Sequence, residues 1–251
     1  MRIGACQTPE ILGDVDAALR VMRDFALHAD AASVDLLLFP ECFLQGYLVT
    51  EEHLNTYALK LDSPRFDAVL TQLAQLRQML VFGMIEQADG HYYNTAVVIA
   101  GGKVIGRYRK TFLVRGESLF SAGDSYPVFD CAGVHFGINI CYDTQHPQAA
   151  AAVAAAGAQA LLVPAQNMMS REKAFWWQDR HNEIRACRAQ ETGMWLASAD
   201  VTGERGSTHL GLGPTGILNP AGESMGQVPT GVPGMATADI NPVTQSNLDD
   251  P

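Results

Sequence analysis

The chain contains 251 residues, of which 47% are hydrophobic and 18% are charged. This composition is typical of a globular protein with one large domain or two small ones, and it argues against disorder. The formal net charge of -10 at pH 7 gives a surface that repels phosphate backbones and anionic lipid. Nucleic acids and membranes are therefore poor candidates for its partners.

We expect neither a targeting segment at the N-terminus nor a membrane span in the longest apolar run. The chain begins MRIGACQTPE, which lacks the charged region and long apolar stretch of a secretory signal, so we expect a strand here. The run QAAAAVAAAGAQALLVP is mostly alanine and ends in proline. A helix followed by a strand explains it better than a membrane span, which needs roughly 20 strongly apolar residues.

The cysteines indicate neither disulfides nor a metal site. There are five of them, an odd number, and no two are spaced as CxxC. No pair of His or Cys has a familiar metal-ligand spacing, so no metal is expected. A reducing, cytoplasmic compartment suits such thiols best. The five are Cys6, Cys42, Cys131, Cys141 and Cys187.

The first half of the sequence alternates between strand patterns and helix patterns. Asp14 is a suitable N-cap for a helix over about residues 15–30, and Ser63 followed by Pro64 marks a second helix start. A pair of glycines separates the last two strands, which we expect to form a hairpin. The expected strands are residues 2–7, 34–40, 80–86, 94–100 and 103–109.

The same order returns in the second half. A strand over residues 134–141 is followed by the alanine-rich helix, and a strand over residues 160–164 is followed by a helix from Ser170 to about Thr192. A strand over residues 194–200 comes next, and GPTGILN begins a final hairpin. Each half thus follows the order strand, helix, strand, helix, strand, strand.

This order predicts an α/β fold. Strands that alternate with helices favour sheets covered by helices. Two similar halves indicate two mixed sheets packed face to face with helices outside, which is a four-layer αββα sandwich. Because no low-complexity linker separates the halves, we expect a single domain over residues 1–251, with a polar C-terminal tail from about residue 241.

Three chemically reactive residues follow predicted strands. Glu41 follows LLLFP, Lys110 follows KVIGRYR, and Cys141 follows HFGINI. In sheets covered by helices, ligands gather outside the carboxyl ends of the strands. A carboxylate that takes the thiol proton, an ammonium that stabilises an oxyanion and a thiol nucleophile would together make a catalytic site.

Each of these residues also has an ordinary structural interpretation. A cysteine at the end of a strand is commonly a small buried hydrophobe. Glu41 follows a proline and could be a solvated loop residue, while Lys110 stands in a basic stretch and could be a solvated cation. Position alone does not decide between these interpretations, so the sequence around each residue must.

The surrounding segments resemble the nitrilase superfamily of carbon–nitrogen hydrolases. FPECFLQGY matches a PExFxxGY-like segment, YRKTFL followed by GESLFSAGD matches an RKxxL-like segment, and GINICYD matches an ICYD-like segment. The three occur in the family's order. The resemblance runs from QTPEILGD near the start to ATADI near the end, which is nearly the whole chain.

The resemblance implies a role for each residue. Glu41 would be the general base, Lys110 the oxyanion stabiliser and Cys141 the nucleophile. Glu117 matches a second family glutamate that helps to position the site, and the backbone N–H of Tyr142 would complete the oxyanion hole. The implied reaction cleaves a small amide to an acid and ammonia through a cysteine thioester, with no metal and no organic cofactor. The family also implies the αββα fold and a homodimer or higher homo-oligomer.

The sequence departs from the family pattern in segments that bear on the substrate. The family often reads CYDxRFP, whereas CYDTQHP places Gln145 in the arginine position and removes a cation. Where many members read Pro-Ala-Trp, PAQNMMS makes Gln166 and Asn167 candidate substrate-binding residues, with an ordinary loop as the alternative. Tyr47 is a third candidate, and core packing is its alternative.

Other motifs have simpler explanations. GLGPTG fits GxGxxG, but no helix follows and Pro214 removes an amide donor, so we expect no dinucleotide site. His146 precedes a proline, a pair typical of a helix start, and His181 lies within an expected helix, where it would be solvated or partly packed. Trp176 and Trp177 point in different directions on that helix, so one is expected in the core and the other at the pocket or a dimer face.

Three hypotheses follow. The first is a thiol-dependent hydrolase of the amidase type that acts on a small molecule; an N-carbamoyl amine hydrolase or a nitrilase could use the same triad. The second is a catalytically silent binding or regulatory protein on the same scaffold. The third is a cysteine–histidine peptidase, which needs His146 or His181 beside the thiol. Omega-amides, carbamoyl amines, aliphatic amides and nitriles all remain open as substrates.

Overall fold

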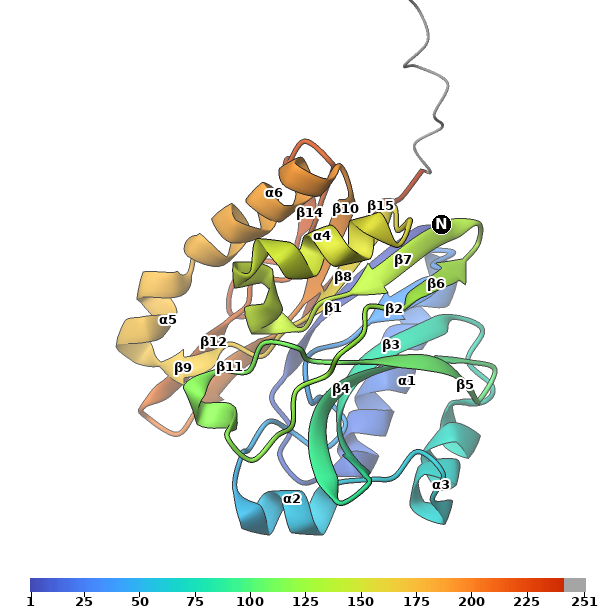
Figure 1. Cartoon of the computed structure of the whole chain (residues 1–251), viewed down its shortest axis with the longest axis vertical. Helices are drawn as coiled ribbons and strands as arrows, with labels where there is room; N and C mark the ends of the chain where they lie inside the picture. The colour runs from blue at the N-terminus through green and yellow to red at the C-terminus, as the bar shows by residue number, and fades with distance from the viewer. Residues whose placement is uncertain (242–251) are drawn as a thin grey trace, which may run out of the picture.

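Two β-sheets form the centre of the computed structural model, which describes residues 1–241 (Figure 1). Each sheet contains both parallel and antiparallel strand pairs. The larger, nine-stranded sheet contains β1 (Arg2–Pro9), β2 (Leu36–Leu38), β3 (Met79–Ala88), β4 (His91–Ala100), β5 (Lys103–Arg109), β9 (Met168–Ser170), β11 (Val201–Arg205), β12 (His209–Leu212) and β15 (Gly234–Asp239). The six-stranded sheet contains β6 (Val128–Cys131), β7 (Val134–Ile138), β8 (Ala160–Pro164), β10 (Trp195–Ala199), β13 (Gly216–Leu218) and β14 (Ser224–Gln227).

Helices cover the outer faces of the two sheets. The helices are α1 (Val15–Ala31), α2 (Glu51–Tyr57), α3 (Pro64–Leu73), α4 (Pro147–Ala155), α5 (Arg171–Trp177) and α6 (Arg180–Thr192). The apolar faces of α1 and α3 pack on the larger sheet, and those of α4 and α6 pack on the smaller one. Figure 1 shows the two pairs on opposite sides of the strands. The predicted αββα sandwich is confirmed.

The central strands are apolar on both faces because each face is buried. In β2, Leu36 and Leu38 point into the core between the sheets, whereas Leu37 points toward α1 and α3. In β8, Leu162 faces the core between the sheets and Leu161 faces α4 and α6. A strand buried on both sides reads as a continuous apolar run, which is why LLL and ALLVP lack alternation.

The helix starts form as their sequences predict. The Asp14 carboxylate accepts the N–H of Ala17 at 2.8 Å, and α1 begins directly after it. The Ser63 hydroxyl accepts the N–H of Phe66 at 3.3 Å, with a proline at the first position of α3. Each cap satisfies an N–H that has no partner inside the helix. The predicted hairpin of β4 and β5 is also present.

The two halves are less separate than the sequence pattern suggests. The strands β15 and β11 come from the second half, yet they pair with β1 in the larger sheet. The prediction also missed α2, β6, β9, β11, β12 and β15. Several of these are short segments with glycine or polar residues, such as GMATAD in β15. Their strand pairing depends on distant partners rather than on a local apolar pattern.

The helix expected from Ser170 to Thr192 is wrong as one continuous element. It is divided into α5 and α6 at Gln178 and Asp179. The carbonyl oxygen of Asp179 accepts the N–H of Asn182 at 3.1 Å, so a new helix begins there. The Asp179 side chain makes no capping hydrogen bond, so a local N-cap does not account for the break after Trp177.

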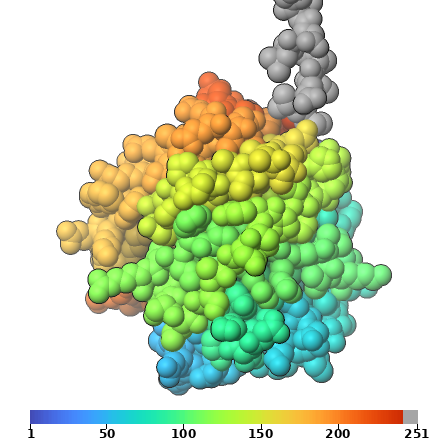
Figure 2. All heavy atoms as spheres, viewed as in Figure 1, coloured from blue at the N-terminus to red at the C-terminus, as the bar shows by residue number. Residues whose placement is uncertain are grey.

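The middle of the chain connects the two halves on one face of the molecule. Figure 2 shows this segment, coloured green to yellow, between the first part of the chain and the last part. The predicted polar tail lies outside the described residues, which end at Asn241, and the single-domain boundary stays a prediction. None of the helices within residues 1–241 combines the length and the apolar character needed to cross a membrane.

Candidate active site

Glu41 lies in the turn after β2, and backbone contacts to both sheets hold it. Its N–H donates to the carbonyl oxygen of Ala165, just beyond β8, at 3.2 Å. On the other side the turn rests on Gly83 of β3, where an added Cβ atom would stand 2.6 Å from the carbonyl carbon of Glu41. Only a glycine permits this close approach of two backbones. The Glu41 carboxyl is therefore buried at a fixed position.

Lys110 follows β5 directly, and its ammonium group lies between two buried carboxyl groups. Its Nζ is 2.7 Å from Glu41 Oε1 and 3.0 Å from Glu117 Oε1. The side-chain nitrogen of Asn94, from β4, donates to the same two oxygens at 2.7 and 2.8 Å. All four side chains are at most 2% exposed. We refer to Glu41, Asn94, Lys110 and Glu117 as the polar cluster.

Burial sets the protonation behaviour of this cluster. It raises the pKa of Glu41 to about 7; Lys110 lowers that pKa and Glu117 raises it. Burial also lowers the pKa of Lys110, but Glu41, Cys141 and Glu117 outweigh it, so the lysine pKa lies above its usual value. Lys110 therefore stays a cation, while Glu41 can both accept and release a proton near neutral pH.

Cys141 lies just beyond β7, at the first position of the short 3-10 helix η2 (Cys141–Gln145). Its φ is +44°, in the left-handed region that a residue with a side chain seldom adopts, and such strain is typical of functional sites. Burial raises the thiol pKa, Glu41 raises it further, and Lys110 lowers it. At neutral pH the sulfur therefore holds its proton and needs a base to become a thiolate.

Asp143 connects the Cys141 turn to the segment around Lys110. One of its carboxyl oxygens accepts the Tyr108 hydroxyl at 2.8 Å, and the other accepts the N–H of Phe112 at 2.8 Å. The side chain is fully buried. Cys141 and Lys110 thus come from two sheets whose strand ends are joined by hydrogen bonds rather than by loose loops.

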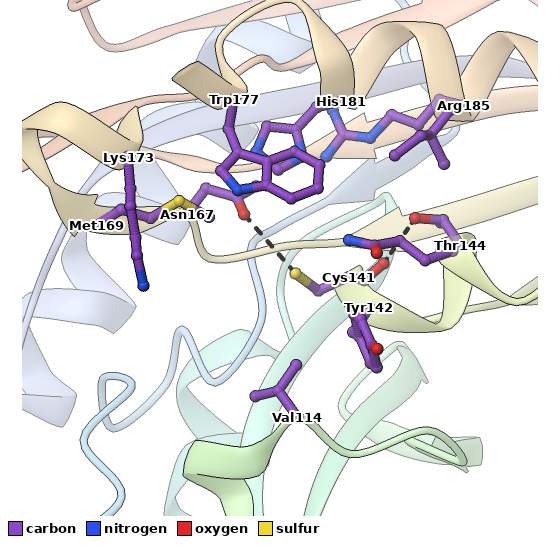
Figure 3. Close-up of a pocket in the computed structure, with 12 residues that line it drawn as sticks. Val114, Cys141, Tyr142, Thr144, Asn167, Met169, Lys173, Trp177, His181 and Arg185 are labelled. Atoms are coloured by element: carbon purple, nitrogen blue, oxygen red, sulfur yellow. Dashed lines mark hydrogen bonds between the residues drawn. The ribbon is translucent and has the colours of Figure 1, made fainter. Parts of the chain in front are cut away.

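The sulfur faces a cavity of about 380 Å³. Figure 3 shows side chains of α5 and α6 on one side of it, and Val114 and Tyr142 on the other. The helical wall consists of Lys173, Trp177, His181 and Ile184. The remaining lining residues are Val114, Cys141, Tyr142, Thr144, Gln145, Asn167, Met169 and Arg185. A cavity of this size suits a small molecule.

The helical wall is aromatic and uncharged at its centre. The rings of Trp177 and His181 stack with their centroids 5.1 Å apart and an interplanar angle of 20°. Burial lowers the pKa of His181 to about 3, and the nearby Arg185 adds to the effect. The imidazole is therefore neutral at neutral pH, so this wall offers a flat, neutral surface to a substrate.

Of the three candidate substrate-binding residues, Asn167 lines the cavity, whereas Gln166 and Tyr47 do not. Tyr142, expected to supply an oxyanion-hole N–H, and Gln145, which stands in the family's arginine position, also line it. The Gln166 side chain instead donates to a carboxylate oxygen of Glu10 at 2.6 Å, outside the cavity lining found in residues 1–241. Tyr47 also lies outside that lining and packs beside Cys42, Leu54, Ile85 and Phe120. The catalytic and binding roles stay predictions.

The predictions for the tryptophans and histidines had mixed outcomes. The expectation that one tryptophan lies in the core is wrong: Trp176 is 53% exposed beneath the Arg180 guanidinium, and Trp177 lines the cavity. His146 begins α4 as expected, and His181 is packed on Trp177.

Sequence reasoning missed three residues that shape the site. Asn94 is polar within an otherwise apolar strand, which is a usable signal for a buried role. Asp200 directly follows β10, so the strand-end rule that found Glu41 could also have found it. Arg185 gave no signal, because a basic residue on a polar helix is ordinary. Among residues 1–241, no group of three or more His, Cys, Asp or Glu side chains is arranged to hold a metal ion.

An αββα sandwich that brings a buried glutamate and a buried lysine close to a cysteine at the edge of a cavity is typical of a class of thiol-containing hydrolases. Residues 2–247 match the family model for carbon-nitrogen hydrolases. The chain therefore belongs to the carbon–nitrogen hydrolase family. The predicted membership of the nitrilase superfamily is confirmed, and so is the prediction of an amidase-type carbon–nitrogen hydrolase.

Known relatives agree with this assignment. A hydrolase in the pqqF 5' region of Pseudomonas protegens is 35% identical over 67% of this chain, which spans only 60% of that relative. An (R)-stereoselective amidase from Pseudomonas sp is 30% identical over 87% of this chain and 74% of its own length. The solved amidase from Nesterenkonia sp. AN1 superposes with a TM-score of 0.80 at 26% identity, over 96% of this chain and 93% of that one.

Two further structures of the Nesterenkonia amidase show ligands. In one variant acrylamide is added to the active-site cysteine, and another variant is in complex with butyramide.

Proposed function

We propose that the protein hydrolyses small primary amides to the acid and ammonia through a thioester on Cys141. One observation supports this above all: a buried carboxyl group and a buried cation form an ion pair whose charges act on the thiol that faces the cavity. Glu41 and Lys110 are 2.7 Å apart, and the charge of each acts on the thiol. The amidases among the relatives support an amide rather than a nitrile or a carbamoyl amine as the substrate.

The first half of the proposed reaction forms the thioester. Glu41 takes the proton of the Cys141 thiol, and the sulfur attacks the carbonyl carbon of the amide. Lys110 Nζ and the backbone N–H of Tyr142 stabilise the negative charge that develops on the carbonyl oxygen. This N–H lies in the first turn of η2, where N–H groups have no partner inside the helix. Glu41 then gives its proton to the nitrogen, the carbon–nitrogen bond breaks and ammonia leaves.

The second half returns the enzyme to its resting state. Glu41 takes a proton from a water molecule, whose oxygen attacks the thioester carbon. The same Lys110 and Tyr142 groups stabilise the oxyanion again. The carbon–sulfur bond breaks, the sulfur of Cys141 recovers a proton from Glu41, and the acid leaves. The proposed steps use only the polar cluster, the thiol, the Tyr142 N–H, the substrate and water.

The electrostatics of the site suit this sequence of proton transfers. Because burial raises the thiol pKa, the sulfur attacks only when a base removes its proton. A carboxyl group with a pKa of about 7 is near the optimum for a group that must act as base and acid in turn at neutral pH. Glu117 adds a second negative charge that holds Lys110 in place and raises the pKa of Glu41.

The cavity supports a short acyl group. Its volume of about 380 Å³ lies near the lower end of the range for small-molecule sites. The Nesterenkonia amidase binds butyramide, a four-carbon amide, at its own site. Aliphatic amides of about this length are therefore the first substrates to test.

Ammonia release from matched primary amides, carbamoyl amines and nitriles tests the proposal. The Cys141→Ala protein is the blank, because it lacks the sulfur but leaves the ion pair of Glu41 and Lys110 in place. We expect the amides to be the best substrates and the blank to be inactive. Preference for a nitrile or a carbamoyl amine would contradict the substrate class, and full activity of Cys141→Ala would contradict the mechanism.

The silent-scaffold hypothesis predicts a different result. If the protein only binds its ligand, no compound of the panel is hydrolysed and the thiol of the folded protein stays unreactive toward iodoacetamide at neutral pH. We expect instead that iodoacetamide modifies Cys141 and abolishes activity, and that a bound amide slows this modification. Mass spectrometry of the modified peptide distinguishes Cys141 from the exposed Cys187.

We further propose that the protein is a cytoplasmic homo-oligomer. Phe175 and Trp176 on α5 are 60% and 53% exposed, and neighbouring exposed aromatic side chains are typical of an interface. Light scattering of the full chain tests the assembly, and a monomer at micromolar concentration would contradict it. Five free cysteines support a reducing compartment, which fractionation of the source cells can check.

A further inference from the structure

The carboxamide of Asn167 lies between the reactive sulfur and a buried carboxylate. Its side-chain nitrogen donates to Asp200 Oδ2, and its backbone N–H donates to Asp200 Oδ1 at 2.9 Å. The remaining polar atom, Asn167 Oδ1, is 3.9 Å from the sulfur of Cys141 and lies at the cavity (Figure 3). The amide group thus presents its oxygen to the reacting centre.

Asp200 is itself held firmly. It is fully buried directly after β10, and its Oδ1 accepts the N–H of Val201 at 2.9 Å. The Arg185 guanidinium, from α6, lies 3.7 Å from Oδ2. Arg185 is fixed in turn by the carbonyl oxygen of Pro214 at 2.7 Å and the hydroxyl of Ser198 at 3.1 Å. Burial raises the pKa of Asp200, and Arg185 and the three N–H donors limit that rise.

A carboxylate can only accept hydrogen bonds, so it decides which way the neighbouring amide turns. The NH₂ group of Asn167 must face Asp200, and its oxygen must face the sulfur. Reversal would bring two acceptor oxygens together in a buried place, which is costly. The ion pair with Arg185 therefore fixes the position of an acceptor in the cavity.

We propose that Asp200, paired with Arg185, is a positioning residue that turns the oxygen of Asn167 toward the reacting carbon and so selects substrates that carry an N–H there. This inference rests on the proposed function, since it assumes attack by Cys141. The attacked carbon lies about 3–3.5 Å from the sulfur in a reactive complex. The amide nitrogen is one bond further, within reach of Asn167 Oδ1. An ester oxygen or a nitrile nitrogen has no hydrogen to donate to it.

The same oxygen has a partner before the substrate arrives. In the free protein the thiol of Cys141 donates its hydrogen to Asn167 Oδ1. When that proton passes to Glu41, the oxygen loses its donor and becomes free to accept the substrate N–H. The acceptor is therefore satisfied at rest and again in the reacting complex, which avoids the cost of an unpaired buried oxygen.

The test compares butyramide with ethyl butyrate. Both would form the same thioester on Cys141, but only butyramide carries N–H groups on its leaving group. Asn167→Ala removes the acceptor. We expect kcat/KM for butyramide to fall about tenfold, the effect of one hydrogen bond to the reacting group, while that for ethyl butyrate changes less than about threefold. Parallel losses on both substrates would overturn the inference and leave the proposed function standing.

Asp200→Asn gives the sharper result because it keeps the shape of the side chain. The new amide offers an NH₂ group to Asn167, which turns its own NH₂ toward the sulfur and meets the substrate with a donor. We expect the ratio of butyramide to ethyl butyrate activity to fall further than in Asn167→Ala. The variant loses the hydrogen bond to the substrate N–H and also places an N–H donor against it. An unchanged ratio in the folded variant would overturn the inference.

Two controls keep the test decisive. Asn182→Ala removes a surface hydrogen bond to Gln227 from the same helix as Arg185 and leaves the Arg185–Asp200 pair in place, so we expect its ratio to match that of the wild type. Asp200→Asn leaves Arg185 buried with one anion fewer; if circular dichroism shows that it does not fold, the Asn167→Ala ratio decides alone. If the wild type hydrolyses neither compound, the proposed function fails. This outcome differs from one in which the variants lose activity equally on both substrates, which contradicts only the inference.

Discussion

The polar cluster and the helical wall meet at the Cys141 sulfur, but they are built in different ways. In the polar cluster, Glu41, Asn94 and Lys110 follow or lie within strands, and Glu117 ends the 3-10 helix η1 (Arg115–Glu117). All four side chains are at most 2% exposed and share several hydrogen bonds each. The helical wall comes from α5 and α6, and an aromatic stack of Trp177 on His181 holds its centre. The sheets thus fix the reacting groups, while the helices shape the space for the substrate.

This difference predicts two kinds of mutational effect. Groups that act in the transition state lower kcat when they are removed, whereas groups that only contact the substrate raise KM. We therefore expect changes in the polar cluster to reduce kcat and changes in the helical wall to alter KM. A clear exception on either side would show that the two regions are not separate in function.

The largest effect is expected from Glu41→Gln, which keeps the shape of the side chain but cannot take a proton. Loss of a general base costs about 10²–10⁴-fold in rate, so kcat for the best amide should fall by that factor. Steady-state kinetics of ammonia release measure it. Glu204→Gln is the matched control, because Glu204 pairs with Arg171 on the surface. A drop of less than about threefold in Glu41→Gln would remove Glu41 from the mechanism.

The next effect tests whether the position of the Glu41 carboxyl group matters as much as its ability to take a proton. Gly83→Ala places a methyl group 2.2 Å from the backbone nitrogen of Cys42 and pushes the Glu41 turn away from β3. A misplacement of about 1 Å can cost 10²-fold in rate, and overpacking costs about 1–3 kcal/mol in the free energy of unfolding. Kinetics and urea unfolding measure the two losses.

Gly226→Ala is the control for this substitution. Gly226 also lies in a strand, but a Cβ atom there would be 3.6 Å from its nearest neighbour, which is ordinary contact. We expect activity and stability of Gly226→Ala close to those of the wild type. If Gly83→Ala keeps full activity, the turn after β2 can shift without loss, and the polar cluster is less rigid than its contacts suggest.

The sequence predicts the polar cluster far better than the helical wall, for a physical reason. Strand ends meet at one edge of a sheet, so Glu41, Lys110 and Cys141 could be assigned to one site from local patterns and from the family motifs. The sandwich itself followed from the order of strands and helices. No local pattern reports that α5 ends at Trp177 and that α6 restarts behind it, since this depends on packing against the cavity.

Asn94 and Asp200 illustrate the same limit inside the site. Each is an ordinary polar residue in sequence, and its importance depends on a partner far along the chain. Asn94 reaches Glu41, and Asp200 is 33 residues from Asn167, with which it shares two hydrogen bonds. Such contacts are long-range and polar, and the apolar periodicity that predicts strands and helices carries no information about them.

A moderate effect is expected in the helical wall. Trp177→Ala removes the flat surface beside the sulfur, so KM for the best amide should rise about tenfold, with kcat changed less than threefold, as for a lost hydrophobic contact of roughly 1.4 kcal/mol. Leu27→Ala is the control: this side chain on α1 is 69% exposed and lies outside the cavity, so both constants should stay unchanged. If Trp177→Ala instead reduces kcat alone, the wall takes part in positioning the reacting groups.

The smallest effect concerns the pH dependence that the polar cluster produces. Glu41 must be deprotonated to act as a base and its pKa is about 7, so kcat/KM of the free enzyme should fall as the pH drops below about 7. Glu117 carries a negative charge that raises this pKa. Glu117→Gln removes the charge, so the acid limb of the pH profile should move to lower pH, whereas the surface substitution Glu204→Gln should leave it in place. If the acid limb of the Glu117→Gln profile is unchanged or moves to higher pH, a group other than Glu41 controls that limb.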